Sequence, residues 1–325
     1  MSLGRGRLKN KEHRIIITGT SGVLGSYILR QFTDVPDARV LAMDRRGTAE
    51  TGEQGSLIRR VVDFWDRDEI DGLIREFNPT CLIHSAATGT RQPRPAWNQM
   101  VRINLGLSVA LCQAVAAVPG CHFVQISTGL AYRDQGRPLV ETDALDTRHP
   151  YGATKAAADV LVRSAAAELN VPITVFRPFS FTGRGDYGNR LFPALLRCAL
   201  EKTPFAMSAG GQVRDHCHAQ DIASAVVAAA MQQVSTEPPE RIYNLGSGDT
   251  RTLRELVASV CDELGLDVKI NFGASAYHRF EPMYLVADAT RAGTELEWKP
   301  SLRFSDAVRE LAAASFPQLK LQPGA

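Results

Sequence analysis

A tyrosine and a lysine four residues apart, Tyr151 and Lys155, are the clearest candidates for chemistry in this sequence. At that spacing the two side chains share one face of a helix. A free tyrosine has a pKa of about 10, but a nearby ammonium, a helix N-terminus or another bound positive charge would stabilise its phenolate. Pro150 suits a first helical turn and predicts that Tyr151 lies near that positive end. Tyr151 could therefore take a proton from a substrate hydroxyl.

Two hydroxyl side chains follow a candidate strand upstream of this pair. Ser127 and Thr128 lie at the end of the apolar run 122–127. Ligands of doubly wound α/β proteins bind at the carboxyl ends of strands, so Thr128 could hydrogen-bond the same substrate oxygen as Tyr151. A Tyr-x-x-x-Lys pair alone is commonly a surface pair, and its combination with these hydroxyls and a glycine turn indicates a catalytic site.

The glycine turn comes directly after the apolar run 14–18, where Gly19, Gly22 and Gly25 lie three residues apart. Glycine accepts a positive φ and lets a pyrophosphate approach the backbone. The helix that begins near Gly22 offers free N–H groups and the positive end of its dipole. Gly25 allows close packing of that helix on the strand, so the turn predicts a dinucleotide site.

An acidic residue, Asp44, ends the second strand candidate, about 25 residues after the first glycine of the turn. Its carboxylate can accept hydrogen bonds from the adenosine ribose hydroxyls and repels a 2′-phosphate. We therefore expect NAD as the cofactor. NADP remains an alternative, because Arg45 or Arg46 could pair with a 2′-phosphate.

A parallel sheet would position these side chains. Up to about residue 180, short runs rich in β-branched residues alternate with helical stretches, which predicts βαβ units, a Rossmann-type doubly wound α/β sheet and helices on both of its faces. The expected strands are 14–18, 39–43, 59–62, 80–84, 122–127 and 172–177, and the expected helices are 22–33, 66–77, 97–118 and 151–169.

The pattern changes after residue 180, with helical stretches near 189–202 and 220–232 and a strand near 241–245 that could return to the main sheet. We predict a smaller mixed α/β substrate-binding domain. The predicted division is 13–179 plus about 215–245 for the dinucleotide-binding domain, about 180–214 plus 246–315 for the substrate-binding domain, and 1–12 for a flexible basic arm.

Composition narrows the possible partners. The 325 residues include 37 Lys and Arg against 35 Asp and Glu, and this near balance disfavours nucleic acid. No apolar run approaches the about 18 residues that span a membrane. Six cysteines without a C-x-x-C pair suggest reduced thiols and a cytoplasmic protein. His216, Cys217 and His218 are adjacent and point in different directions, so we expect no metal site.

Together these motifs resemble those of the extended short-chain dehydrogenase/reductase family, which includes nucleotide-sugar epimerases, dehydratases and ketoreductases. The resemblance covers about residues 13–312. Further motifs that carry it are Asp63 after the third strand, the run 83–87, Asn104, Ser127-Thr128 before Tyr132, Arg177-Pro178, the run 214–221 and the run 243–248.

The resemblance implies a role for each matching residue. Thr128, Tyr151 and Lys155 would be catalytic, and a nucleotide sugar would contact Thr128, Ser180, Asn189, Arg214 and Arg279. The implied NAD-binding residues are Gly19, Ser21, Gly22, Val23, Leu24, Gly25, Asp44, Arg45, Asp63, Phe64, Ser85, Ala86, Ala87, Asn104, Ser127, Tyr151 and Lys155. Family members commonly form homodimers through two long helices, here 97–118 and 151–169.

The two residues directly after Thr128 narrow the possible reactions. The family's 4,6-dehydratases carry Asp-Glu there, whereas this chain has Gly129 and Leu130, so a dehydratase is disfavoured. Asp44 favours tightly held NAD and hence an epimerase acting at the sugar C4. Ser180 stands where the epimerases usually have asparagine, which keeps a 4-keto-sugar reductase open. A non-catalytic dinucleotide sensor and an enzyme for an apolar ketone are weaker alternatives.

Overall fold

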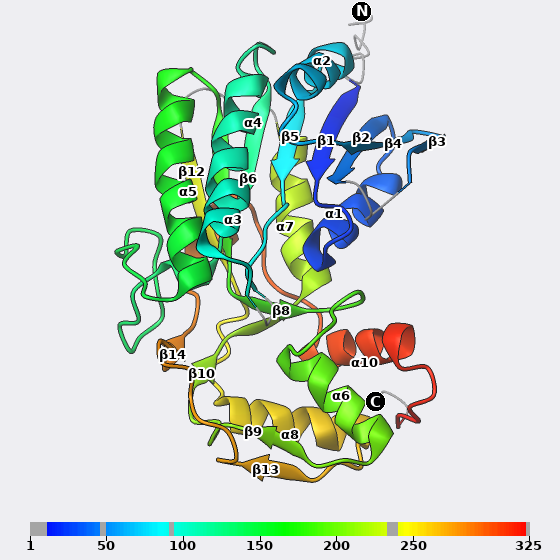
Figure 1. Cartoon of the computed structure of the whole chain (residues 1–325), viewed down its shortest axis with the longest axis vertical. Coiled ribbons are helices and arrows are strands. Elements are labelled where there is room, and N and C mark those ends of the chain that lie inside the picture. Colours follow the sequence, from blue (N-terminus) through cyan, green and yellow to red (C-terminus); the bar gives the residue numbers. More distant parts are fainter. Residues whose placement is uncertain (1–11, 46–49, 91–93, 233–239, 323–325) are drawn as a thin grey trace, which may run out of the picture.

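The computed structural model describes residues 12–45, 50–90, 94–232 and 240–322 (Figure 1). Arg46 and nearly all of the predicted basic arm lie outside these ranges. Within them, the largest sheet has the strand order β12-β7-β6-β5-β1-β2-β4-β3. Its strands are β1 (His13–Thr18), β2 (Ala38–Arg45), β3 (Gly52–Gln54), β4 (Leu57–Val62), β5 (Cys81–His84), β6 (His122–Ile126), β7 (Ile173–Pro178) and β12 (Glu240–Leu245).

All neighbouring strands of this sheet are parallel except β3, which pairs antiparallel with β4 at one edge. Strand β12 pairs with β7 at the other edge, so the chain returns to the sheet as its sequence suggested. Side chains of β1, such as Ile15, Ile16 and Ile17, are buried on both faces, as expected for a sheet that helices cover on two sides. The predicted doubly wound fold class is confirmed.

Helices form a layer on each face of the sheet (Figure 1). Helices α1 (Val23–Thr33) and α7 (Ala219–Met231) lie side by side and pack with α9 (Thr290–Glu295) against one face. Helices α2 (Arg67–Phe77), α4 (Leu107–Val115) and α5 (Pro150–Glu168) bury their apolar sides against the other. The two resulting cores fix the sheet, and with it the loops at its carboxyl edge.

The helix expected at 97–118 is not continuous. It consists of α3 (Trp97–Val101), a π-helical turn (Arg102–Gly106) and α4. The wide turn carries Asn104, whose side chain bonds both backbone groups of Thr88 at 2.8 Å and donates to Thr154 Oγ1 at 2.9 Å. Asn104 therefore joins the loop after β5 to helix α5.

A separate core lies below the carboxyl edge of the sheet in Figure 1. It is built from α6 (Leu191–Glu201), β9 (Phe205–Met207), α8 (Leu253–Leu264), β13 (Ile270–Phe272) and α10 (Phe304–Ser315). Short parallel strand pairs connect it to the sheet. They are β8 (Ser180–Thr182) with β11 (His216–His218) and β10 (Val213–Arg214) with β14 (Tyr284–Leu285). The predicted domain boundaries stay a prediction.

The glycine turn shows why helix α1 needs a residue without a side chain on its inner face. A Cβ atom on Gly25 would overlap the carbonyl oxygen of Gly19. Gly19 itself has a φ of +76°, and a Cβ there would lie 2.7 Å from the backbone of Ala86. Helix α1 thus rests directly on the end of β1, which places its N-terminus at the carboxyl edge of the sheet.

We predict that Gly25→Ala lowers the free energy of unfolding by about 1–3 kcal/mol, because the methyl group has no space. The control is Gly72→Ala on the surface of α2, where a Cβ would meet nothing within 4 Å. That variant should gain up to about 1 kcal/mol from helix propensity. Urea unfolding measures both, and equal stabilities of the two variants would contradict the packing argument.

Candidate active site

A cleft at the carboxyl edge of the sheet contains half of the residues singled out from the sequence. It is lined by eleven of them: Gly22, Val23, Leu24, Gly25, Ser85, Ala87, Ser127, Thr128, Tyr151, Lys155 and Ser180. These residues come from α1 and from the loops and helices after β5, β6 and β7. The order of the strands in the sheet brings the glycine turn and the Tyr151–Lys155 pair to the same carboxyl edge, which is where proteins of this fold class bind their ligands.

Helix α5 holds Tyr151 in its first turn. His149 caps the helix by accepting a hydrogen bond from Gly152 N at 3.3 Å, and Pro150 occupies the first helical position. A Cβ atom on Gly152 would overlap the carbonyl oxygen of Leu130, so α5 sits directly on the turn that follows β6. This contact sets Tyr151 beside Thr128.

Thr128 begins that turn and is nearly buried, with its Oγ1 accepting a hydrogen bond from Leu130 N at 3.2 Å. The hydroxyl hydrogen therefore stays available to a ligand in the cleft. The next residue, Gly129, packs under the ring of Phe179, which a Cβ at position 129 would meet at 2.8 Å. The site thus offers the Thr128 hydroxyl and has no room for a side chain directly after it.

Burial dominates the electrostatics of the pair on α5. It raises the pKa of Tyr151 to about 12, against a smaller opposing effect of the Arg190 charge. Burial also lowers the pKa of Lys155 to about 8, opposed by Asp159 one turn along the helix. The sequence predicted a stabilised phenolate, but the chain's own groups have the reverse effect because desolvation of Tyr151 outweighs the charge of Arg190. Tyr151 therefore holds its proton at neutral pH in these surroundings.

The residues around Lys155 fit a dinucleotide. Lys155 is 2% exposed, and its Nζ makes no hydrogen bond to any part of the chain that the structure describes. Two nearby buried atoms, Ser127 Oγ and His84 Nε2, also lack partners among the described residues. Lys155 and Ser127 could hold ribose hydroxyls, and the bare backbone of the glycine turn could hold a pyrophosphate.

Asp44 lies at the end of β2, where the sequence analysis predicted a ribose-binding acid. Its carboxylate accepts hydrogen bonds from Thr20 Oγ1 and, at 3.2 Å, from Ser21 N. A carboxylate has about four acceptor sites, so it can tie the glycine turn to β2 and still accept from a ribose. Arg45 is exposed at the next position.

The other predicted cofactor residues lie outside the lining of the cleft. Asp63 is exposed after β4 and accepts a hydrogen bond from Trp65 N at 3.0 Å, while Phe64 packs against the sheet core. Ala86 N lies 3.4 Å from Thr18 Oγ1, in the loop after β5. Asn104 is fully buried and engaged, which makes it a positioning residue.

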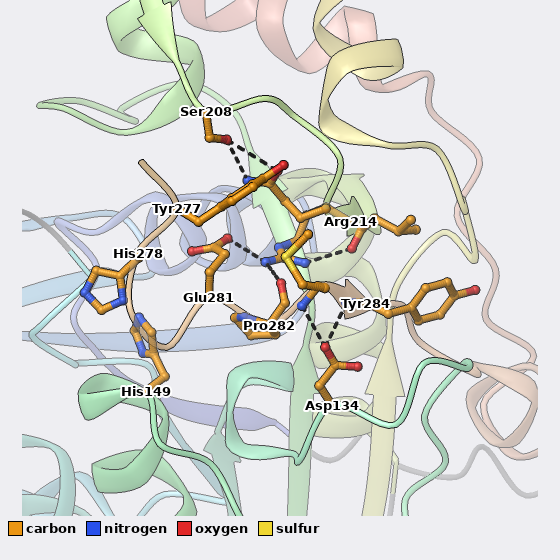
Figure 2. A network of polar contacts seen from close by, with 12 residues as sticks. Asp134, His149, Ser208, Arg214, Tyr277, His278, Glu281, Pro282 and Tyr284 are labelled. Carbon is orange, nitrogen blue, oxygen red and sulfur yellow. Dashed lines mark hydrogen bonds and ion pairs between the residues drawn. The ribbon is translucent and has the colours of Figure 1, made fainter. Parts of the chain in front are cut away.

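Of the predicted substrate residues outside Thr128, only Ser180 lines the cleft. Arg214 is nearly buried, and its Nη2 donates to Glu281 Oε1 at 2.6 Å and to the carbonyl oxygen of Pro282 (Figure 2). Arg279 is exposed, with its guanidinium 5.1 Å from the ring centre of Phe280.

Asn189 is also exposed and accepts a hydrogen bond from Arg197 at 3.3 Å. Its neighbour Arg190, which the sequence analysis did not select, lines the cleft and acts on the pKa of Tyr151. Arg190 is held by Asp186, with Nη1 to Oδ1 at 2.9 Å. The opposite charges of Asp186 and Arg190, four residues apart, were the sequence pattern that could have identified Arg190.

Comparison with known proteins fits this arrangement. The sequence model of the NAD dependent epimerase/dehydratase family matches residues 15–246. The chain belongs to this family. The predicted family, enzyme class and NAD dependence are thereby confirmed.

Curated relatives of the chain include two kinds of enzyme. A dTDP-glucose 4,6-dehydratase of Neisseria gonorrhoeae is 24% identical, with 91% of this chain and 93% of that protein covered. A UDP-glucose 4-epimerase of Corynebacterium glutamicum is 25% identical, with 88% and 91% covered. Relatives at this distance do not separate epimerase from dehydratase.

Solved structures share the fold. UDP-glucuronic acid 4-epimerase from Bacillus cereus, in complex with UDP-glucuronic acid and NAD, superposes with a TM-score of 0.81 at 21% identity. The match covers 93% of this chain and 98% of that one.

Among the described residues, no helix is both long and apolar enough to span a membrane, and no three His, Cys, Asp or Glu side chains form a metal-binding group.

We predict that His84 makes the protein sensitive to acid. Burial, with a smaller effect of the Lys155 charge, lowers the pKa of His84 to about 3, whereas an unfolded histidine has a pKa of about 6.5. Between these values only the unfolded chain gains the proton, so the free energy of unfolding falls by about 1.4 kcal/mol per pH unit as the pH drops.

The matched variant is His84→Gln, which can keep a hydrogen bond to Thr18 Oγ1 but does not titrate. Urea unfolding at pH 6, 5 and 4 should show a pH dependence shallower than that of the parent by about 1.4 kcal/mol per unit. Parallel slopes for the two proteins would show that His84 does not stay neutral in the fold.

Proposed function

We propose that this protein is an NAD-dependent nucleotide-sugar epimerase that acts at the sugar C4, with Tyr151 as the acid/base. The observation that carries the proposal is one cleft lined by the glycine turn, Thr128, Tyr151 and Lys155. Relatives and structural neighbours named for nucleotide sugars support a substrate of that class. The geometry of the turn after β6 favours epimerisation over elimination.

That turn argues against a dehydratase. The dehydratases that the chain resembles place an aspartate and a glutamate directly after the strand-end threonine, as acid and base for loss of the 6-hydroxyl. Here a side chain at position 129 would run into the ring of Phe179. Leu130 follows, so neither carboxyl group can be supplied from this turn.

The chain's own residues account for the proton movements. Thr128 and Tyr151 would both hydrogen-bond the 4-hydroxyl oxygen, and Tyr151 would take up and later return its proton. Lys155 would hold the nicotinamide ribose and, while protonated, favour the tyrosinate. NAD bound in this cleft would accept a hydride from C4 and give it back. Tyr151 and Lys155 are both buried, which would limit the access of water to the proton transfer.

The second candidate is a reductase of 4-keto sugars that uses free NAD(P)H. Two observations favour it: Ser180 faces the cleft where epimerases of this family usually have asparagine, and Arg45 is exposed beside Asp44. Thr128, Tyr151 and Lys155 would serve this reaction too, so products rather than geometry separate the two.

We also propose a homodimer built on the neighbouring helices α3 and α5. Their outer faces expose large apolar side chains, including Trp97, Val101, Val160 and Leu161. Two of these are about half exposed, Val160 and Leu161 at 49% each. An apolar face of this kind on two adjacent helices suits pairing with a second copy.

The proposed activity predicts a defined product. Purified protein incubated in D2O with UDP-glucose, UDP-glucuronic acid or dTDP-glucose, without added cofactor, should form the C4 epimer of one of them. Because the same hydride returns, NMR should show no deuterium at C4. A 4-keto-6-deoxy product, or turnover only with added NAD(P)H and a 4-keto sugar, would contradict the epimerase.

The variant for this assay is Tyr151→Phe, which removes one hydroxyl from the cleft. Loss of the acid/base should lower kcat by about 10²–10⁴-fold. The control is Tyr243→Phe, which loses only a hydrogen bond to Glu295 on the far side of the sheet core and should keep kcat. Unchanged turnover in Tyr151→Phe would remove Tyr151 from the mechanism.

A further inference from the structure

Three basic side chains meet at the N-terminus of helix α5. Arg94 Nη2 lies 3.2 Å from His149 Nε2, and Arg94 Nη1 lies 3.4 Å from His278 Nε2. The centres of the two imidazole rings are 6.0 Å apart. Figure 2 shows both histidines next to each other and close to the Arg214–Glu281 pair.

Both histidines are also approached by a donor from the other side. His149 Nδ1 faces Gly152 N at 3.3 Å, and His278 Nδ1 faces Phe280 N at 3.3 Å. A neutral imidazole has a single acceptor nitrogen. In either tautomer, each ring therefore turns one N–H toward another N–H, and the cluster has more donors than acceptors.

No carboxylate of the described residues compensates this excess. Arg94 forms no ion pair within the described ranges, and the nearby carboxylate of Glu281 pairs with Arg214. Glu281, three residues after His278, accepts a hydrogen bond at its Oε1 from Arg214 Nη2. Burial and the charges of Arg94, His278 and Arg214 lower the pKa of His149 to about 4, and no acid opposes them. The cluster is therefore a positively polarised set of N–H donors with no carboxylate acceptor among the residues that the structure describes.

Arg214 is the arginine that the family resemblance offered to an anionic ligand, and here it already has a counter-ion. Its guanidinium is nearly buried and is bonded to Glu281, to Pro282 O and, at 2.8 Å, to Val213 O. Neighbouring Asp134 fixes the same segment by accepting from Met283 N and Tyr284 N (Figure 2). Among the described residues around this segment, Arg94 and the two histidines approach one another through nitrogen atoms and have no carboxylate partner.

We propose that Arg94, His149 and His278 form an oxyanion subsite for the substrate, a site that takes a phosphate or a carboxylate group. The inference rests on the proposed function. His149 caps the helix that carries Tyr151 and is acted on by the charge of Arg214, so the cluster lies next to the residues that the resemblance assigns to the substrate. The dipole of α5 adds to the attraction.

A nucleotide sugar could supply this anionic group from two places, its diphosphate or a carboxylate on the sugar. Calorimetric binding of UDP, UDP-glucose and UDP-glucuronic acid to the full chain distinguishes them. For a phosphate, Arg94→Gln and His278→Asn should each raise the Kd of all three by about 10–100-fold, the range for a charged hydrogen bond. For a carboxylate, only UDP-glucuronic acid should weaken.

The matched control is Arg75→Gln, an exposed arginine on α2 away from the cleft, which should bind all three like the parent. Two variants are used so that a folding defect in one does not decide the result. If the parent binds the ligands and both variants bind them equally well, the subsite is wrong while the proposed function stands. If the parent binds none of them, the proposed function fails, and the subsite with it.

Discussion

The cleft depends on one close contact, in which helix α5 rests on the turn after β6. Gly152 meets the carbonyl oxygen of Leu130 with no space for a Cβ, and so the helix that carries Tyr151 cannot move away from Thr128 without opening the packing. On its other side, α5 is tied through Thr154 to Asn104 and from there to the loop after β5. The hydroxyls of the cleft and the cofactor loop are thereby held as one unit.

This close packing has an electrostatic consequence. It desolvates Tyr151 and Lys155, which raises the pKa of the first and lowers that of the second. Tyr151 therefore holds its proton more tightly than it would in water, and Lys155 holds its proton less tightly. The positive charge of the nicotinamide ring of NAD would shift the protonation equilibrium of Tyr151 toward the tyrosinate. Arg190 is the cation that acts on Tyr151 from the chain itself, although it lies far from α5 in sequence. The proton affinities of Tyr151 and Lys155 therefore arise mainly from burial, which the spacing of the two residues does not show.

Local sequence patterns predicted most of the fold, because runs of β-branched residues and glycine turns determine the backbone conformation of the few residues that contain them. The strand predicted at 14–18 spans His13–Thr18, and the helix predicted at 151–169 spans Pro150–Glu168. The break at Asn104 was missed because its partners lie 16 and 50 residues away. For the same reason no local pattern shows that Arg214 is bonded to Glu281, 67 residues later. Motifs located the site, but tertiary contacts decide which of its charges remain available.

The central claim is that this cleft retains NAD and uses it in a closed cycle, with hydride taken from and returned to the same sugar. The most direct measurement is to denature the purified protein, free of added cofactor, and quantify the released nucleotides by mass spectrometry. The account predicts close to one NAD per chain. Protein that releases no dinucleotide, or releases NADP, and that turns over a 4-keto sugar only with added NADPH would contradict it.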